Sequence, residues 1–327
     1  MKKNIVVAYK PDPDQKAIYR EFLGDLAQIA FLNDLSEQDR IQALKTADVL
    51  ISLSFSQEEI KPAELSLLEH VRFIQLIYAG ADNIPFERIS SDLTVASNVG
   101  AFAKPIAEHV LALTLALAKN LIPKHEQLKS RKFDRSGFNQ ELIGGVCGII
   151  GFGGNGREIA RTMRAMGMKI YGINRSGTTD MPVDFIGTRK DLESVLEASH
   201  VVVVATPLTR ETENLIGEDE LGRMRKNAIL INVGRGAVVN QEALYKHLKA
   251  TPEFRAGIDT WWSEPAEQEA FDLEYPFFDL PNIIGSPHCA DHVPGAIPYA
   301  TRRALENVRN YLTGKELRGV INRADYL

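Results

Sequence analysis

The sequence predicts an α/β fold built from parallel sheets. Through most of its 327 residues, short apolar runs of strand length alternate with polar, helix-like segments, an order that places helices on both faces of a parallel sheet. Near the middle of the chain, a glycine-rich turn separates one apolar run from the helix-like segment that follows it. The length is sufficient for two domains, and the composition, 44% hydrophobic and 25% charged, is that of a globular protein.

Residues 1–97 are expected to form a complete small α/β unit. Ser36, with Asp39 three positions later, resembles a capping box that opens a helix ending at Thr46. Pro62 suits the first turn of a second helix, which ends near residue 70. The expected strands are residues 5–8, 27–31, 49–53, 73–77 and 93–96.

Residues 103–133 are expected to form one long helix, rich in alanine and leucine over 110–118. Pro105 lies near its start, and Pro123 predicts a break or a kink. A helix that is apolar around most of its circumference is buried either inside its own subunit or against another subunit. We favour the second position, and hence a homodimer, while the internal position remains open.

The second half of the chain supplies another series of strands. The run over 201–204 consists of four valines, which is typical of a strand buried on both faces. A helix over 241–250 is expected to be capped by Asn240. The expected strands are residues 146–150, 169–173, 201–205, 228–233, 254–258 and 282–285.

The end of the chain indicates how the two series are divided into domains. A last helix is expected over 299–312, after Pro298. This terminal segment can return to the first unit. We therefore assign residues 1–97 and 295–327 to one discontinuous domain and residues 98–294 to a second domain, which contains the glycine-rich turn.

The glycine-rich turn has the G-x-G-x-x-G spacing, and this predicts that residues 98–294 are a dinucleotide-binding domain. Gly151 permits a tight turn, Gly153 lets the backbone approach a pyrophosphate, and Gly156 lets the helix pack closely on the strand. The free N–H groups at the start of that helix then receive the phosphates. The residues expected to bind the cofactor here are Gly151, Gly153, Gly154, Asn155 and Gly156.

The end of the second strand bears on which nicotinamide cofactor is bound. The ribose-binding acid is expected roughly 18 to 20 residues beyond the last glycine, where the chain has Asn174, Arg175 and Ser176. An asparagine removes the repulsion of a 2′-phosphate, and Arg175 can pair with that phosphate. NADP(H) is therefore favoured, and NAD(H) is possible if Arg175 is only a solvated loop residue.

Charge and cysteine content exclude several classes of partner. The net charge of −5 gives no basic footprint for nucleic acid. No uninterrupted apolar stretch is long enough to span a membrane, so no membrane partner is expected. Cys147 and Cys289 are far apart in sequence and form no CxxC pattern, so the simplest interpretation is a reduced, cytoplasmic protein.

Polar residues follow three of the expected strands, at the edge where open α/β sheets bind their ligands. Arg235 lies between two glycines, Glu264 precedes a proline, and His288 follows one. Each has an ordinary structural explanation, as a surface, turn or core residue respectively. Together an arginine, a glutamate and a histidine make a site for a carbonyl compound that carries a carboxylate.

Two other interpretations of this region are weaker. Cys289 beside His288 suggests a nucleophile, but adjacent residues of an extended segment point to opposite faces. His288 and His292 have the spacing of helical metal ligands, but Pro294 and the lack of a third ligand disfavour a metal site. No metal is therefore expected.

Over nearly its whole length, the chain resembles the D-isomer-specific 2-hydroxyacid dehydrogenase family. The stretches that carry the resemblance are residues 101–109 (AFAKPIAEH), 148–156 (GIIGFGGNG), 205–224 (ATPLTRETENLIGEDELGRM), 229–241 (ILINVGRGAVVNQ), 259–265 (DTWWSEP) and 282–288 (NIIGSPH). The resemblance implies a Rossmann-type dinucleotide-binding domain inserted into a smaller, flavodoxin-like α/β substrate domain. It also implies interconversion of a 2-oxoacid and a D-2-hydroxyacid by hydride transfer.

By this resemblance, Arg235 binds the substrate carboxylate and His288 is the general acid/base, paired with Glu264. The other implied contacts are Asp259 with the nicotinamide carboxamide, Thr206 and Val233 on loops along the dinucleotide, and Tyr78, Ala79 and Gly80 on the loop that holds the carboxylate.

Departures from the family pattern bear on the substrate. Phe102 stands where many members have asparagine, and Asn155 replaces a usual apolar residue. Phe102, Tyr78, Trp261 and Trp262 suggest an apolar or aromatic substrate side chain, unless these aromatics belong to the core.

Two alternatives to this function remain. The expected strand end at residues 52–56 has no arginine or lysine, which argues weakly against a 3-phosphoglycerate enzyme, but a 3-phosphoglycerate- or glyoxylate-type member of the same family remains possible. A cofactor-binding sensor or corepressor with little turnover also remains possible.

Overall fold

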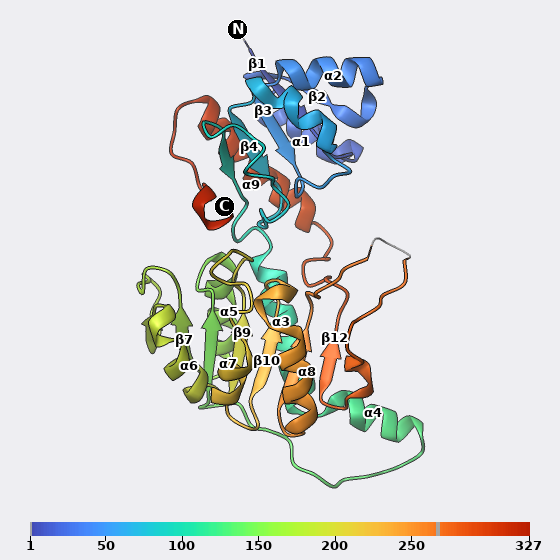
Figure 1. Cartoon of the computed structure of the whole chain (residues 1–327), viewed down its shortest axis with the longest axis vertical. Helices are drawn as coiled ribbons and strands as arrows, with labels where there is room; N and C mark the ends of the chain where they lie inside the picture. The colour runs from blue at the N-terminus through green and yellow to red at the C-terminus, as the bar shows by residue number, and fades with distance from the viewer. Residues whose placement is uncertain (1, 266–268) are drawn as a thin grey trace. The chain divides into compact units, whose positions relative to one another are not determined.

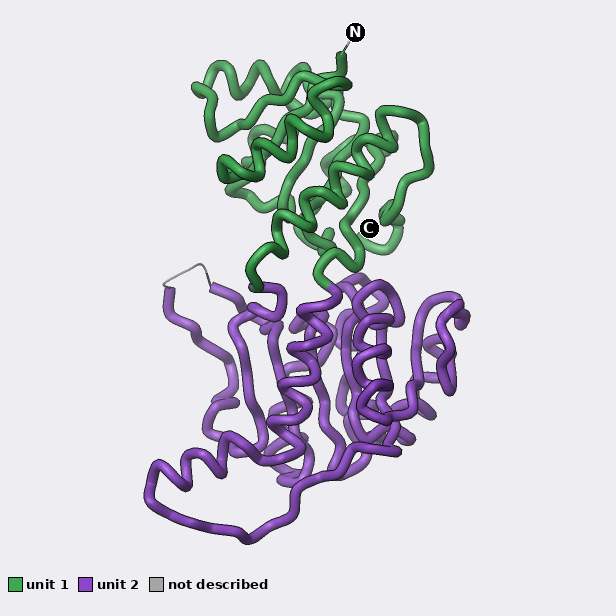
Figure 2. Tube along the Cα trace, turned by 180° about the vertical axis from the view of Figure 1, so that it is seen from behind, with its two compact units in different colours: residues 1–102, 293–327 green, residues 103–292 purple. Residues whose placement is uncertain are grey.

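The computed structural model of the chain describes residues 2–265 and 269–327. The chain divides into two compact units, Met1–Phe102 with Val293–Leu327, and Ala103–His292 (Figure 2). We call these unit 1 and unit 2. Each unit contains one parallel sheet with helices packed on it, and the chain leaves unit 1 to form unit 2 before returning. The α/β fold class predicted from the sequence is therefore confirmed.

Unit 1 contains a five-stranded sheet in the order β2-β1-β3-β4-β5, which is the flavodoxin-like order (Figure 1). Each strand pairs in parallel with its neighbours, and Ser52 at the end of β3 lies opposite Leu76 at the end of β4. The strands are β1 (Lys3–Val7), β2 (Ala27–Phe31), β3 (Val49–Ser52), β4 (Phe73–Leu76) and β5 (Thr94–Ala96).

Local signals in the sequence fix the helix starts of unit 1. Asp12 and Gln15 form a capping box at α1, and the Ser36 hydroxyl accepts a hydrogen bond from the Asp39 N–H at the start of α2. Helix α9 begins at Ala296, earlier than expected, because Pro298 lies in its first turn, where an N–H is not required. The elements are α1 (Pro13–Leu23), α2 (Glu37–Thr46), the 3₁₀ segments η1 (Leu32–Asp34), η2 (Pro62–His70) and η6 (Arg323–Asp325), and α9 (Ala296–Leu312).

Unit 2 contains a seven-stranded parallel sheet in the order β12-β11-β10-β9-β6-β7-β8. Counted from β6, this is the dinucleotide-binding order 3-2-1-4-5-6 with one further strand, and the order reverses between β6 and β9. The strands are β6 (Val146–Ile150), β7 (Lys169–Ile173), β8 (Phe185–Gly187), β9 (Val201–Val204), β10 (Ile229–Asn232), β11 (Arg255–Ile258) and β12 (Ile283–Gly285).

Helices cover both faces of the second sheet. Along β9, Val202 and Val204 belong to the core beneath α6, α7 and α8, whereas Val201 and Val203 belong to the core beneath α3 and α5. This alternation explains why all four positions are apolar. The elements are α3 (Ala103–Ala118), α4 (Leu121–Lys129), α5 (Gly154–Ala165), α6 (Leu192–Ala198), α7 (Glu218–Arg223), α8 (Gln241–Ala250), η3 (Arg189–Asp191), η4 (Gly236–Val238) and η5 (Phe277–Asp279).

The prediction of a single helix over residues 103–133 was wrong, because the chain forms two helices there. The chain breaks at Asn120, which has a positive φ of 51°, and α3 and α4 meet at a 60° bend. Pro123 causes no break because it lies in the first turn of α4. Within residues 2–265 and 269–327, no single helix is long and apolar enough to cross a membrane, and α3 and α4 meet that length and composition only when taken together across the bend.

Candidate active site

The glycine-rich turn joins β6 to α5, at the point where the strand order reverses. Gly151 has a φ of +103°, and a side chain there would lie 2.6 Å from the Thr206 nitrogen. A side chain at Gly156 would overlap the carbonyl oxygen of Gly151, so helix and strand pack as closely as the sequence suggested. Gly153, the N-cap of α5, faces open space. Because no protein atom requires a glycine there, Gly153 fits the close approach of a ligand phosphate to the helix start.

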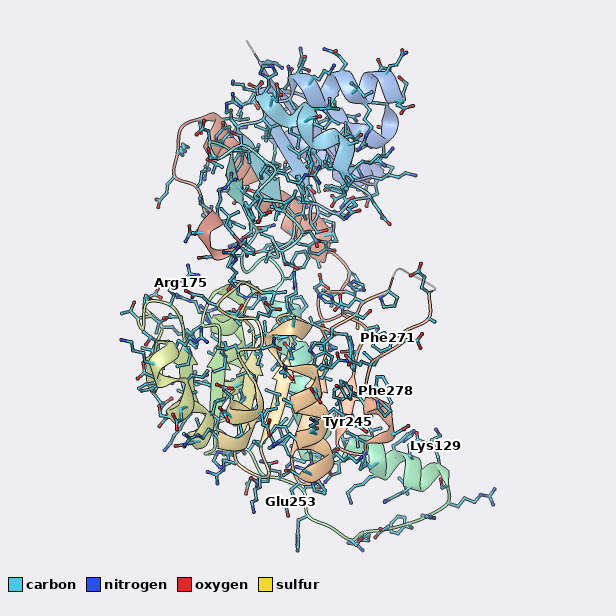
Figure 3. The ribbon with its side chains drawn as sticks, viewed as in Figure 1. Lys129, Arg175, Tyr245, Glu253, Phe271 and Phe278 are labelled. Atoms are coloured by element: carbon cyan, nitrogen blue, oxygen red, sulfur yellow. The ribbon has the colours of Figure 1, made fainter. Side chains whose placement is uncertain are left out.

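At the end of β7, the side chain of Asn174 holds a turn of its own backbone. Its amide nitrogen donates to the Thr178 carbonyl at 2.8 Å, and its oxygen accepts from the Gly177 N–H at 2.7 Å. Arg175 and Ser176 follow on the exposed part of this turn (Figure 3). The expected cofactor residues Thr206 and Val233 follow the neighbouring strands β9 and β10, at the same edge of the sheet.

Arg235 follows β10 in a tight turn, and the flanking positions 234 and 236 have no room for a side chain. A side chain at Gly234 would lie 2.6 Å from the Thr206 carbonyl oxygen, and one at Gly236 would overlap the Trp261 backbone. The buried Asn232 fixes the turn, accepting from the Gly234 N–H at 3.1 Å and donating to the Arg235 carbonyl at 3.0 Å. The close backbone approach inferred from the flanking glycines is therefore present.

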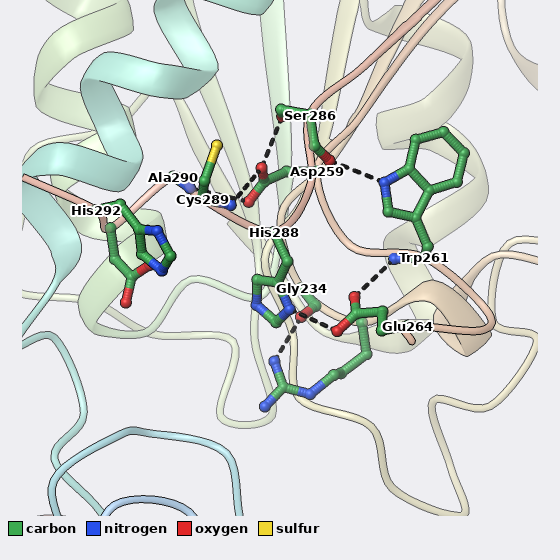
Figure 4. A network of polar contacts seen from close by, with 11 residues as sticks. Gly234, Asp259, Trp261, Glu264, Ser286, His288, Cys289, Ala290 and His292 are labelled. Atoms are coloured by element: carbon green, nitrogen blue, oxygen red, sulfur yellow. Dashed lines mark hydrogen bonds and ion pairs between the residues drawn. The ribbon is translucent and has the colours of Figure 1, made fainter. Parts of the chain in front are cut away.

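His288 and Glu264 come together from the segments that follow β12 and β11 (Figure 4). The Nδ1 atom of His288 lies 2.7 Å from Oε2 of Glu264, and Oε1 of Glu264 accepts the Trp261 N–H at 2.9 Å. Both side chains are about two-fifths exposed, 41% for His288 and 39% for Glu264. The pair is therefore held in a defined geometry while it stays accessible to a ligand.

The surroundings of the pair favour the charged forms of both His288 and Glu264. The hydrogen bond to Glu264, together with the negative charge of that residue, raises the pKa of His288 although burial and the positive charge on Arg235 act to lower it. Burial acts to raise the pKa of Glu264, but the hydrogen bonds from His288 and the Trp261 N–H leave that pKa below its usual value. Arg235 therefore acts electrostatically on both members of the pair.

Asp259 organises the backbone around His288. Its buried carboxylate accepts from the Ser286 hydroxyl at 2.6 Å and from the N–H groups of Cys289 and Ala290 at 3.1 and 3.3 Å, while its carbonyl accepts the His288 N–H at 2.8 Å. The residue expected to position the nicotinamide is thus also the anchor of the histidine turn.

Two residues around Asp259 had been given no role from the sequence. The Nε2 atom of His109, on α3, lies 2.8 Å from the Ser286 hydroxyl and 3.4 Å from the Asp259 carboxylate. His109 ends one of the stretches that resemble the family, and Ser286 precedes His288 by two positions. Before the structure was known, these two features of the sequence were all that pointed to His109 and Ser286 as site residues.

The extended conformation assumed for residues 288 and 289 was wrong, because His288 has a left-handed φ of 49°. Another observation disfavours Cys289 as a nucleophile. Burial, followed by the negative charge of Asp259, raises the pKa of its thiol and so disfavours the reactive thiolate. His292 lies 3.7 Å from Asp291, and the described residues contain no group of three His, Cys, Asp or Glu side chains arranged to hold a metal ion.

The four aromatic residues linked to the substrate divide into two pairs. The indole N–H groups of Trp261 and Trp262 donate to backbone carbonyls of Ser286 and Val239, and both rings pack among phenylalanines. These tryptophans therefore serve as structural residues of unit 2. In unit 1, Tyr78 stacks on Phe102 with ring centroids 5.0 Å apart.

Tyr78, Ala79 and Gly80 follow β4 in unit 1, whereas the other expected site residues belong to unit 2. Unit 2 thus brings together a guanidinium, an imidazole and its carboxylate at the edge of the sheet that also carries the glycine-rich turn. This arrangement can bind an anionic group and exchange a proton with it.

Comparison with known proteins identifies the family. The family model for the D-isomer specific 2-hydroxyacid dehydrogenase NAD binding domain matches residues 111–290. A glyoxylate reductase of Thermococcus gammatolerans is 30% identical over 288 residues, which cover 85% of this chain and 84% of the relative.

A D-3-phosphoglycerate dehydrogenase of Methanocaldococcus jannaschii is 27% identical over 308 residues, and the match covers 92% of this chain but only 57% of that longer relative. A solved structure of a D-isomer specific 2-hydroxyacid dehydrogenase family protein from Aeromonas salmonicida has a TM-score of 0.81 at 25% identity, covering 98% of this chain and 99% of the other. The chain belongs to the D-isomer specific 2-hydroxyacid dehydrogenase family.

Proposed function

We propose that the protein is an NAD(P)-dependent oxidoreductase that interconverts a 2-oxoacid and a D-2-hydroxyacid. The observation that carries this proposal is the Glu264–His288 pair, which lies within the electrostatic influence of Arg235. Family membership alone supports an oxidoreductase, whereas the pair supplies the acid/base that the reaction requires.

The roles of the side chains follow from their contacts. Arg235 binds the substrate carboxylate, because its planar guanidinium can donate two parallel hydrogen bonds to it. Glu264 occupies Nδ1 of His288, so Nε2 is the ring nitrogen that exchanges a proton with the substrate oxygen. In reduction His288 donates that proton, and in oxidation it accepts it. When bound, the nicotinamide cofactor supplies or accepts the hydride.

The turn of residues 151–156 fits the pyrophosphate of the cofactor, because the N-cap of α5 has open space at Gly153. We favour NADP(H) over NAD(H). The end of β7 carries no acid at Asn174, and Arg175 on the exposed turn offers a cation to a 2′-phosphate. Asp259, which anchors the histidine turn, is assigned to the carboxamide as well.

The loop after β4 is assigned to the substrate. The N–H groups of Ala79 and Gly80 hold the carboxylate, and Tyr78 with Phe102 offers an aromatic surface. An apolar or aromatic 2-oxoacid is favoured, although the structural role of both tryptophans removes half of the residues that had suggested it. In this scheme unit 1 is the substrate domain.

We further propose a cytoplasmic homodimer that uses α4 and the segment after it. No residue of α4 is buried, and Leu121, Ile122 and Leu128 are about half exposed. Phe133 and Phe138 are 81% and 97% exposed, so they would be covered in a dimer. Sedimentation equilibrium of the wild type and of Phe138→Glu tests this assembly, and a monomeric wild type would refute it.

The central experiment is a screen of the purified protein against 2-oxoacids with NADPH and with NADH. The panel includes pyruvate, phenylpyruvate, hydroxypyruvate, glyoxylate and 3-phosphohydroxypyruvate. The 2-oxoacids whose side chains are uncharged and larger than that of glyoxylate are expected to be reduced with a kcat/KM above that of glyoxylate. Cofactor binding without turnover of any member would instead favour a sensor.

A further inference from the structure

The turn that follows β3 in unit 1 surrounds a buried carboxylate. Glu59 is only 7% exposed, and its Oε1 accepts from the Leu53 N–H at 2.6 Å and from the Ser52 hydroxyl at 2.9 Å. Its Oε2 accepts from the N–H groups of Ser54 and Ser56 at 3.1 and 3.0 Å. Three backbone N–H groups and the Ser52 hydroxyl therefore converge on one anionic group, and the Ser54 hydroxyl lies 3.5 Å from its Oε2.

Such convergence is the arrangement by which proteins bind external oxyanions. The turn bends back sharply because Phe55 has a positive φ of 61°, and the Phe55 N–H is satisfied separately by the Ser52 hydroxyl oxygen at 2.8 Å. Glu59 thus satisfies the donors that would otherwise be available to a ligand. It also leaves a negative charge at the carboxyl end of a parallel strand, the edge at which these sheets bind ligands.

The turn lies directly beside the loop assigned to the substrate. Strands β3 and β4 are neighbours, and the Tyr78 N–H donates to the Leu53 carbonyl oxygen at 3.0 Å. Leu53 therefore connects the Glu59 turn to the first residue of the Tyr78–Ala79–Gly80 loop. A substrate group that extends from this loop toward β3 meets the turn.

We propose that Glu59 determines substrate specificity by excluding 2-oxoacids that carry a second anionic group at their far end. This inference rests on the proposed function. A phosphate or carboxylate on the substrate side chain finds the donors of the turn already engaged and meets the charge of Glu59. A neutral side chain meets no such penalty.

The first test asks whether the turn is an anion site, and it requires no turnover. Glu59→Ala removes the internal carboxylate, and Glu58→Ala removes the same charge from an exposed neighbouring position. Melting temperatures are measured with and without inorganic phosphate at constant ionic strength. The wild type and Glu58→Ala keep the cofactor and carboxylate sites, so both report how far phosphate binding at those sites raises the melting temperature. Phosphate is expected to raise the melting temperature of Glu59→Ala by more than it raises that of either of these proteins.

The second and deciding test is the ratio of kcat/KM for 3-phosphohydroxypyruvate to that for hydroxypyruvate. We expect this ratio to rise by about tenfold or more in Glu59→Ala, because like charges in a binding site oppose each other strongly. Should Glu59→Ala fail to fold, Glu59→Gln, which keeps the shape of the side chain, is expected to raise the ratio in the same direction.

A folded Glu59 variant whose ratio stays within about twofold of Glu58→Ala overturns the proposal, even if it binds phosphate. A wild type that reduces no 2-oxoacid refutes the proposed function instead. The phosphate measurement would still report on the turn in that case, so the two failures are distinguishable.

Discussion

The Nδ1 atom of His288 lies 2.7 Å from Oε2 of Glu264, and this contact raises the pKa of the imidazole while it lowers that of the carboxyl. The same Glu264 side chain accepts the Trp261 N–H, so the histidine is paired with a carboxylate that is itself fixed to the backbone. Glu264 therefore has the largest effect on the pKa of His288, and changing this residue changes the pH dependence of any reaction that uses the histidine.

Glu264→Gln is expected to move the pH profile to lower pH. Reduction requires protonated His288, so its kcat/KM falls as the pH rises through the raised pKa, above the usual 6.5. Without the Glu264 charge, burial and Arg235 both lower that pKa. The alkaline limb of the reduction profile, measured with a saturating cofactor, should shift toward acid. A limb that stays in place would mean that another group titrates.

His288→Ala is expected to lose most turnover while it still binds cofactor. Removal of a general acid/base typically costs about 10²- to 10⁴-fold. Retained quenching of protein fluorescence by NADPH would show that the dinucleotide site is intact. His292→Ala, whose ring is exposed nearby, is the matched control and should retain activity. Turnover by His288→Ala equal to that of this control would remove His288 from the mechanism.

Arg235→Lys is expected to raise KM for the 2-oxoacid by about 10- to 100-fold, because lysine keeps the charge but loses one charge-assisted hydrogen bond of the fork. The positive charge near His288 is preserved, so the pH profile should change little. Steady-state kinetics of Arg235→Lys are compared with those of Arg225→Lys, because Arg225 is exposed and lies outside the site. An unchanged KM would show that the carboxylate binds elsewhere.

The sequence predicted most of the strands and the glycine-rich turn because both depend on local information. Apolar runs identify buried strands, and Gly151 adopts a φ that other residues rarely reach. The three-residue strand β8, Phe185–Gly187, was missed because only its last residue is buried, so it gives no apolar run. The break at Asn120 was placed wrongly at Pro123 because a positive φ in a non-glycine residue has no reliable local signal.

The candidate site could be predicted only in part from the sequence. Polar residues after successive strands indicated that Arg235, Glu264 and His288 share an edge, as the topology of a parallel sheet requires. The contact between His109 and Ser286 spans 177 residues, and no spacing rule connects them. The hydrogen-bond donors around Glu59 could not be predicted from the sequence either, because backbone N–H groups converge only once the turn is folded.

Ser286→Ala is expected to destabilise the protein and to weaken catalysis together. The mutation leaves the buried Asp259 carboxylate without its shortest hydrogen bond, at a cost of about 1–3 kcal/mol. It also loosens the turn that holds His288. Urea unfolding and kcat/KM are compared with Ser194→Ala, whose exposed hydroxyl donates only to a neighbouring carbonyl. A loss of stability with unchanged kcat/KM would mean that the turn keeps its geometry without Ser286.

Arg175→Gln is expected to reduce kcat/KM for NADPH by about tenfold and to leave the value for NADH unchanged, since only NADPH carries the 2′-phosphate that a guanidinium can bind. Asn174 holds the turn through Thr178 and Gly177, so the substitution at the exposed Arg175 should not unfold it. Lys190→Gln, also exposed in unit 2, controls for the loss of one positive charge. If the wild type prefers NADH, or if Arg175→Gln affects both cofactors equally, the assignment to NADP(H) fails, because the 2′-phosphate would then contribute nothing that Arg175 recognises.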